Sequence, residues 1–275
     1  MSTLPFPHVS VIGAGLMGAG IAQVAATAGC HVTLRDIDPA QTAKAKRAIE
    51  ASTAKLVEKG KLSASDREAA LRRITFTDAL GTAAQADLVI EAIVEDLATK
   101  RALWQELEEL APPGTVFASN TSSLKVADQA AVTDRPDRFL GLHFFNPVPL
   151  MPLVEVVRTD AADPAIVARA VDFVRRLGKE PVLARDTAGF VVNVLLIPYL
   201  LDAIRLLERG TATIADIDTA MKLGAGYPMG PFTLLDTVGL DTVLHTTRAM
   251  HAEYREVRFQ APPMLERLVA TGRLG

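Results

Sequence analysis

The sequence predicts a doubly wound, mostly parallel α/β sheet with an inserted αα-hairpin, followed by an all-α C-terminal domain. Three observations support this fold class. A short apolar strand, a glycine-rich turn and an alanine-rich helix occupy residues 8–29. Short apolar strands then alternate with helical segments as far as Ala184. Beyond Gly189 only helical patterns follow, so we expect one domain over residues 1–188 and a second over residues 189–275.

The first element is a strand, His8–Ile12, that ends in a glycine-rich turn before a helix reaching about Gly29. The first glycine of Gly-x-Gly-x-x-Gly permits the sharp turn, the second lets a pyrophosphate approach the backbone, and the third lets the helix lie close to its strand. The pyrophosphate would bind at the positive end of the helix. The pattern therefore predicts a Rossmann-type site for a dinucleotide. Its binding residues in the turn are Gly13, Gly15, Leu16, Met17 and Gly18.

The second strand, from His31, ends in Asp36, which lies 23 positions after Gly13. An acid at about this separation accepts hydrogen bonds from the ribose hydroxyls of the cofactor. Because a carboxylate would repel a 2′-phosphate, NAD is favoured over NADP. Arg35 could instead favour a phosphate, but strand alternation directs it to the other face.

Composition excludes several classes of protein. The 275 residues carry a net charge of −3 with no long basic block, so we expect no nucleic-acid partner. No apolar run approaches the length of a membrane span, and residues 1–7 lack the features of a signal peptide. The single cysteine, Cys30, excludes an internal disulfide and fits a reducing compartment. We therefore expect a cytoplasmic protein, or, in a eukaryote, one whose transit peptide has been removed.

Two helical segments follow the second strand. Residues 39–59 place apolar side chains at helical spacing, Gly60 ends this helix, and a capping pattern from Ser63 opens the next. They form the αα-hairpin between strands. Ser52 and Lys59 lie seven residues apart on one face of the longer helix. That face is either solvated surface or, if a phosphorylated ligand lies alongside, an anion contact.

The next strands are expected at residues 74–77, 88–91 and 116–119, with a helix at about 97–111. Ligands of a doubly wound sheet gather at the carboxyl ends of its strands. The side chains that lie just beyond such ends are Glu95, Ser119 and Ser122. Side chains of these types in turns are also ordinary caps, so both interpretations stay open here.

Residues 139–157 contain the candidate catalytic pair. His143 closes one strand, three prolines force an extended turn, and the next strand carries Glu155 among apolar neighbours. Burying a carboxylate there is costly unless it has a partner, and His143 is the nearest candidate across the turn. The carboxylate would keep one ring nitrogen protonated, so that the other can accept a proton from a substrate hydroxyl. The alternative is a purely structural pair within the sheet.

A capped helix from Asp163 and a strand at residues 180–184 complete the predicted sheet domain. The segments expected to be helical beyond it are 190–210, 213–223, 231–254 and 263–272. The first is apolar on most sides, so it is buried or packs against another subunit. Asn193 interrupts it and either forms structural hydrogen bonds or faces a cleft.

Three motifs give the chain a specific resemblance. These are Ser119-Asn-Thr-Ser-Ser, His143-Phe-Phe-Asn-Pro-Val-Pro and Gly189-Phe-Val-Val-Asn193. With them the chain resembles the 3-hydroxyacyl-CoA dehydrogenase family, of the single-function 3-hydroxybutyryl-CoA dehydrogenase type, over nearly its whole length. The resemblance implies oxidation of an L-3-hydroxyacyl-CoA to the 3-ketone with NAD as hydride acceptor, or the reverse. It also implies a homodimer formed through the helical domain. We expect no metal site.

The resemblance also assigns roles to individual residues. His143 matches the general base, Glu155 its carboxylate partner, and Ser122 and Asn193 the polar residues that hold the substrate. For the cofactor, the matching positions are Asp36 at the ribose, Glu95 and Lys100 after the strand at residues 88–91, Ser122, and Asn146 near the nicotinamide. Ser52 and Lys59 match contacts to the CoA portion, which favours the anion-contact interpretation of that helix face.

The chain departs from the family pattern in three places. Pro152 and Val194 replace a common lysine and a common arginine, and residues 271–275 end short of a tail that we expect in the family. Two other functions stay open. A related hydroxyacid or sugar-acid dehydrogenase would act without CoA, and a catalytically inactive NAD-binding structural protein would not act at all. Acyl chain length, a second carboxylate on the substrate and the physiological direction are not readable from the sequence.

Overall fold

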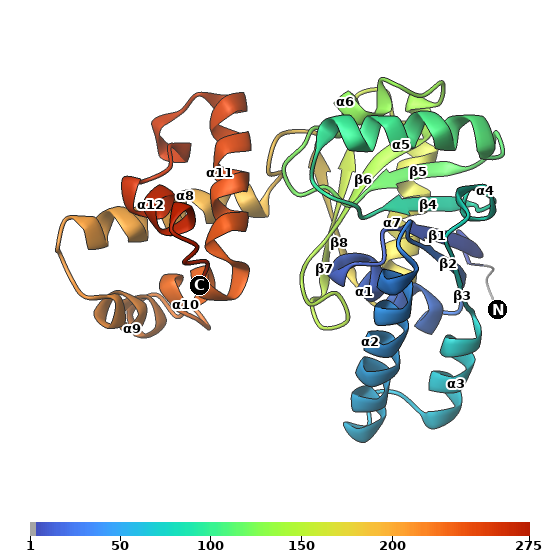
Figure 1. The fold of residues 1–275 in the computed structure, drawn as a ribbon, viewed down its shortest axis with the longest axis horizontal. Helices are drawn as coiled ribbons and strands as arrows, with labels where there is room; N and C mark the ends of the chain where they lie inside the picture. The colour runs from blue at the N-terminus through green and yellow to red at the C-terminus, as the bar shows by residue number, and fades with distance from the viewer. Residues whose placement is uncertain (1–3) are drawn as a thin grey trace. The chain divides into compact units, whose positions relative to one another are not determined.

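The computed structural model describes residues 4–275, which form two compact units. One unit holds the chain up to Thr121 together with residues 125–186, and the other holds residues 122–124 and 187–275. The first is a Rossmann-like, mostly parallel α/β unit, and the second is all-helical (Figure 1). The predicted fold class is therefore confirmed.

The sheet of the first unit has the strand order β3-β2-β1-β4-β5-β6-β7-β8. All neighbouring strands are parallel except β6 and β7, which are antiparallel. The order reverses between β1 and β4, which is where ligands bind in doubly wound sheets. The strands are β1 His8–Ile12, β2 His31–Arg35, β3 Ile74–Thr77, β4 Leu88–Glu91, β5 Val116–Ser119, β6 Phe139–Phe144, β7 Leu153–Arg158 and β8 Glu180–Arg185.

Helices cover both faces of the sheet (Figure 1). On one face α1, α2, α3 and α7 share an apolar core with alternate strand residues. On the other, Trp104 of α5 packs against Phe117 and Phe139, with ring centroids 5.1 and 4.7 Å away. The helices of this unit are α1 Leu16–Thr27, α2 Pro39–Glu58, α3 Ala64–Arg72, α4 Leu80–Ala83, α5 Leu97–Leu110, α6 Val126–Ala130 and α7 Pro164–Arg176, with a 3₁₀ turn at Pro136–Arg138.

The predicted αα-hairpin is present as α2 and α3 between β2 and β3. Asp38 caps α2 by accepting a hydrogen bond from the N–H of Ala40, and the Ser63 hydroxyl caps α3 by accepting one from Asp66. Gly60 turns the chain between them with a φ of 66°. Each side-chain cap satisfies a backbone N–H that the helix leaves unpaired, so the local sequence defines both helix starts.

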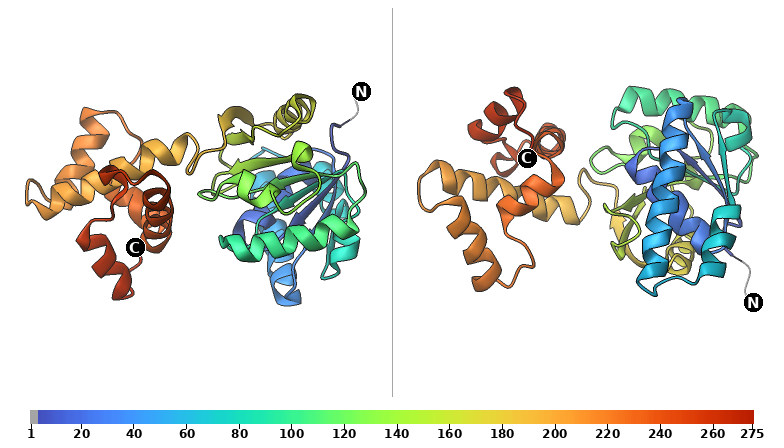
Figure 2. Two further views of the ribbon diagram at one scale, coloured as in Figure 1. Left: turned by 90° about the horizontal axis from the view of Figure 1, so that it is seen from above. Right: turned by 60° about the horizontal axis from the view of Figure 1, so that its bottom comes forward.

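The second unit consists of helices packed around one apolar core, coloured orange to red in Figure 2. Its helices are α8 Val192–Glu208, α9 Ile214–Gly224, α10 Pro231–Val238, α11 Leu240–Tyr254 and α12 Pro263–Ala270, with a 3₁₀ turn at Val257–Phe259. The single helix predicted over residues 231–254 is wrong, because Gly239 has a φ of 92° and separates α10 from α11. A left-handed φ cannot continue a right-handed helix.

Candidate active site

The glycine-rich turn between β1 and α1 forms an open cradle. Gly13 has a φ of 102°, and a Cβ there would lie 2.5 Å from the carbonyl oxygen of Ala92. A Cβ on Gly18 would fall on the carbonyl of Gly13, so α1 can approach its strand only with glycine here. At Gly15 a Cβ would meet nothing within 4 Å. The backbone at Gly15 is therefore accessible to a ligand, and these residues fit a pyrophosphate at the start of α1.

Asp36 lies beside this turn. Its Oδ2 accepts a hydrogen bond of 2.7 Å from the N–H of Ala14, and its Oδ1 accepts one of 3.0 Å from the N–H of Asp38. The carboxylate therefore fixes the turn as well as offering further acceptor sites for ribose hydroxyls. Leu16 begins α1 with an exposed side chain, and Met17 is partly buried against the core.

Behind the turn, the carboxyl ends of β4 and β5 hold a buried charge cluster. Lys100 Nζ lies 2.6 Å from Glu91 Oε1 and 3.1 Å from Glu95 Oε2. The hydroxyl of Ser119 donates a hydrogen bond to Glu91, and the hydroxyl of Thr121 donates one to Glu95. Each of these hydrogen bonds is 2.6 Å long. Lys100 is only 1 % exposed, so its ammonium is enclosed by these acids, whereas Glu95 retains 22 % exposure.

Glu91 is a member of this cluster that sequence reasoning missed as a site residue. It is the last residue of the apolar strand Leu88–Glu91, and no sequence spacing identifies the partners of a carboxylate at that position. Burial raises its pKa, and the Lys100 ammonium, the Ser119 hydroxyl and the N–H of Ile93 oppose that shift. The only signal was an acid at the end of a fully buried strand.

His143 and Glu155 lie directly opposite each other in the antiparallel register of β6 and β7. His143 Nδ1 is 2.6 Å from Glu155 Oε2, and the two residues are 5 % and 0 % exposed. A carboxylate at this distance favours the tautomer in which Nδ1 carries the proton. The side-chain oxygen of Asn120 accepts a hydrogen bond of 2.9 Å from the N–H of Phe144 and fixes the end of β6. A histidine that is oriented by a buried carboxylate is chemically able to act as a general base.

A second buried lysine holds the turn between these two strands in place. Asn146 lies exposed at its start, before a cis bond to Pro147. Lys179 Nζ donates hydrogen bonds of 2.6 Å to the carbonyls of Val148 and Met151. Burial lowers the pKa of Lys179. Pro152, one of the departures from the family pattern, lies exposed at the end of this turn.

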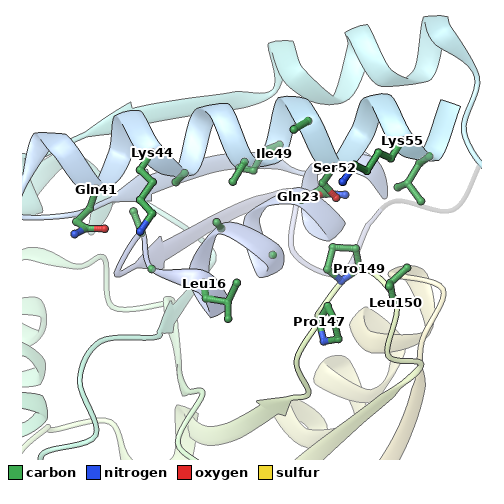
Figure 3. A pocket seen from close by; sticks show the side chains of 18 of the residues that line it. Leu16, Gln23, Gln41, Lys44, Ile49, Ser52, Lys55, Pro147, Pro149 and Leu150 are labelled. Carbon is green, nitrogen blue, oxygen red and sulfur yellow. The ribbon is translucent and has the colours of Figure 1, made fainter. Parts of the chain in front are cut away.

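A cavity of about 480 Å³ lies between the start of α1, one face of α2 and the turn after β6 (Figure 3). Ser52 and Lys59, paired in the sequence analysis, both line it. Its other cationic residues are Lys44, Lys55 and Lys61. The face of α2 is therefore the wall of a pocket with several positive charges, which suits a phosphorylated ligand.

Ser122 and Asn193 come together within the helical unit. The side-chain amide of Asn193 donates a hydrogen bond of 3.2 Å to the carbonyl oxygen of Ser122. Gly189, with a φ of 79°, turns the chain just before α8, and a Cβ there would contact the side chains of Met250 and Asn193. Val194, the other departure, packs partly buried against the core of this unit.

Among residues 4–275, no three His, Cys, Asp or Glu side chains gather as a metal site would require. Over the same residues, none of the helices combines the length and apolar character needed to cross a bilayer. Cys30 is a free, fully buried thiol whose pKa burial raises to about 11.

Two family profiles together match nearly the whole chain. The profile described as "3-hydroxyacyl-CoA dehydrogenase, NAD binding domain" matches residues 8–187. The profile described as "3-hydroxyacyl-CoA dehydrogenase, C-terminal domain" matches residues 189–275. The cradle and acid that fit a dinucleotide therefore lie in a region assigned to NAD binding.

Individual relatives agree with the profiles. The chain is 52 % identical to human mitochondrial hydroxyacyl-coenzyme A dehydrogenase over 275 residues, covering 98 % of this chain and 88 % of that protein. It is 46 % identical to a 3-hydroxybutyryl-CoA dehydrogenase of Mycobacterium tuberculosis, covering 98 % and 94 % of the two chains.

A solved structure supports the same assignment. The crystal structure of (S)-3-hydroxybutyryl-CoA dehydrogenase from Ralstonia eutropha superposes with a TM-score of 0.94 at 37 % identity. The match covers 98 % of this chain and 95 % of that one. The fold, the cofactor cradle and both profiles agree, and the chain belongs to the 3-hydroxyacyl-CoA dehydrogenase family of NAD-dependent oxidoreductases.

Proposed function

We propose that this enzyme interconverts short-chain L-3-hydroxyacyl-CoA, such as 3-hydroxybutyryl-CoA, and the corresponding 3-ketoacyl-CoA, with His143 as general base. The observation that carries the proposal is the buried contact between His143 Nδ1 and Glu155 Oε2. Such a pair fixes both the tautomer and the direction of the ring, which a proton acceptor requires.

The proposed oxidation removes two hydrogens from one alcohol. Nε2 of His143 takes the proton of the 3-hydroxyl, and the electron pair of that O–H bond forms the carbonyl. When bound, NAD supplies the acceptor for the hydride that leaves the same carbon. The ring is then an imidazolium, which the adjacent Glu155 carboxylate stabilises. In the reverse direction His143 returns the proton to the ketone oxygen.

The cavity beside α2 is the proposed site of the CoA nucleotide. Ser52 and Lys59 offer a hydroxyl and an ammonium to its phosphates, and Lys44 and Lys55 add positive charge along the same wall. Figure 3 shows Lys44, Ser52 and Lys55 projecting from one helix toward the cavity. A substrate without phosphates would gain little from such a wall.

The remaining proposed contacts follow the family pattern. For NAD they are Asp36 and Glu95 at the riboses, Lys100 behind Glu95, Asn146 and Ser122 at the nicotinamide end, and the backbone of residues 13–18. Ser122 and Asn193 bind the acyl portion of the substrate. Their mutual hydrogen bond supports a shared role, because it gives both residues a defined place in one unit.

A substrate profile tests this proposal. We expect NADH-dependent reduction of 3-ketoacyl-CoA thioesters to be fastest at four to six carbons, with kcat/KM falling by about tenfold or more for long chains. This is the size of effect that a pocket can exert through a few methylenes. Faster turnover of free 3-hydroxy acids would favour the alternative dehydrogenase, and no turnover of any of these compounds would favour an inactive NAD-binding protein.

We also propose a cytoplasmic location. The single cysteine is buried as a free thiol, which is compatible with a reducing compartment. The human relative is named as mitochondrial, so the matrix is the competing location in a eukaryotic cell. Fractionation of the source cells with compartment markers distinguishes the two.

A further inference from the structure

The buried carboxylate of Glu91 has no role in the function proposed above. It is fully buried, and both of its oxygens are held: Oε1 by the ammonium of Lys100 at 2.6 Å and by the N–H of Ile93 at 2.8 Å, and Oε2 by the hydroxyl of Ser119 at 2.6 Å. Three donors converge on this group. Burying an acid is costly, so this arrangement stabilises an otherwise unfavourable group at a particular place.

That place is next to the cofactor cradle. Glu91 is the last residue of β4, and it pairs in register with Ile12 of β1 and Ser119 of β5. The residue after it, Ala92, is the one that a Cβ on Gly13 would strike. The β4–α5 loop that leads to Glu95 therefore begins at the strand-order reversal, in contact with the glycine-rich turn.

Lys100 connects Glu91 with Glu95. Its ammonium lies closer to Glu91, at 2.6 Å, than to Glu95, at 3.1 Å. One positive charge is thus shared by two acids. Because Glu91 takes the shorter contact, the Glu95 carboxylate is not drawn fully onto the ammonium. Glu95 is also held by the Thr121 hydroxyl at 2.6 Å, and its side chain is 22 % exposed, so a ligand can reach it.

We propose that Glu91 is a positioning residue for NAD binding: it anchors Lys100 so that Glu95 presents its carboxylate to the cofactor. The inference rests on the proposed contact between Glu95 and the cofactor. It also gives Lys100 a different role from direct contact, since an enclosed ammonium acts through the acids around it. If the charge of Glu91 is removed, Glu95 is the sole acidic partner of Lys100 within this cluster. The ammonium then draws the Glu95 carboxylate toward itself and away from the cofactor.

Four variants test the inference: Glu91→Gln, Glu95→Gln, the double variant, and Glu106→Gln as a matched control on the exposed side of α5. Glutamine keeps the shape of the side chain, removes its charge and replaces one acceptor oxygen by an amide donor. We measure the Kd for NADH by fluorescence titration, and kcat and the KM for acetoacetyl-CoA at saturating NADH. Thermal unfolding of each variant checks that it folds.

We expect Glu91→Gln and Glu95→Gln each to raise the Kd for NADH about tenfold, the effect of one charge-assisted hydrogen bond. In Glu91→Gln, the KM for acetoacetyl-CoA and kcat at saturating NADH should stay within about twofold, a split that a general loss of stability would not produce. The double variant should bind NADH no worse than Glu95→Gln alone, because both changes act on one contact.

Two results overturn the inference while leaving the Glu95 contact in place: unchanged NADH affinity in Glu91→Gln when Glu95→Gln is impaired, or losses that multiply in the double variant. Unchanged affinity in Glu95→Gln instead overturns the cofactor contact itself, and the inference with it. If Glu91→Gln does not fold, Ser119→Ala removes one hydrogen bond from the Glu91 carboxylate. It should then give a smaller loss of NADH affinity with the same selectivity, and normal affinity would contradict the inference.

Discussion

The buried pair of His143 and Glu155 is held in place by the sheet itself. The two residues occupy opposite positions on neighbouring antiparallel strands, where side chains on one face are in contact. An unpaired carboxylate at the position of Glu155 would be strongly destabilising, so the imidazole stabilises the acid as much as the acid orients the imidazole. Reactive geometry and local stability therefore depend on the same contact.

At the scale of one side chain, we expect Asp36 to determine the preference for NAD over NADP. Replacing it by asparagine keeps an acceptor for the N–H of Ala14 but removes the charge that would repel a 2′-phosphate. We expect the ratio of kcat/KM with NADH to that with NADPH to fall by about tenfold in Asp36→Asn. Steady-state rates with each cofactor measure this ratio. An unchanged ratio would mean that Asp36 only fixes the turn.

Among the elements, α2 carries the proposed recognition of CoA. Lys59, which caps the C-terminus of α2, lines the cavity, whereas Lys46 within α2 is exposed and is not among the lining residues. We expect Lys59→Met to raise the KM for acetoacetyl-CoA by about fivefold to tenfold, because a cation beside a phosphate is lost. The KM for acetoacetyl-pantetheine, which lacks the nucleotide, should not change, and Lys46→Met should resemble the parent with both substrates. Equal effects of Lys59→Met on the two substrates would contradict a nucleotide contact.

The elements that the sequence predicted best are those with local signals. The glycine pattern predicted β1, its turn and α1, the apolar spacing predicted α2, and the capping residues Ser63 and Asp163 predicted the starts of α3 and α7. The facing positions of His143 and Glu155 were also foreseen, because a short proline-rich turn brings two adjacent strands together. In these cases the determining residues lie within a few positions of the feature.

The features that the sequence did not predict depend on distant parts of the chain. Glu91 meets Ser119, which lies 28 positions away, and Lys179 holds the carbonyl of Val148, 31 positions away. Neither contact has a spacing rule. Gly239 was overlooked as a break because one glycine is tolerated in many helices, and only its left-handed φ shows that α10 ends there. Side-chain networks that join separate strands could therefore be recognised only once the fold was known.

At the scale of the whole molecule, the helical unit leaves large apolar side chains exposed. Leu195 is 69 % exposed and Leu223 is 82 % exposed, and Val191, Ile214 and Tyr227 add further apolar surface. Exposed apolar surface of this kind is typical of protein interfaces. We propose that this surface, which includes residues of α8 and α9, forms the interface of the homodimer that the family resemblance implies.

Light scattering coupled to size exclusion tests this assembly. We expect the parent to elute with twice the chain mass of 29.4 kDa, and Leu195→Glu to shift toward the monomer because a charge would be buried in the interface. Leu110→Glu, at an exposed apolar position in the other unit, is the control and should remain dimeric. A parent that is monomeric at micromolar concentration would contradict the proposal.

In the proposed function, the α/β unit carries the residues for NAD, for the CoA nucleotide and for proton transfer, and Ser122 and Asn193 belong to the helical unit. The most direct test of this account is kcat for NADH-dependent reduction of acetoacetyl-CoA by His143→Ala, compared with the parent at saturating substrates. We expect a loss of about 1,000-fold, within the range for removal of a general acid–base group, with the Kd for NADH unchanged. A His143→Ala variant that turns over at the parental rate would contradict the role of His143.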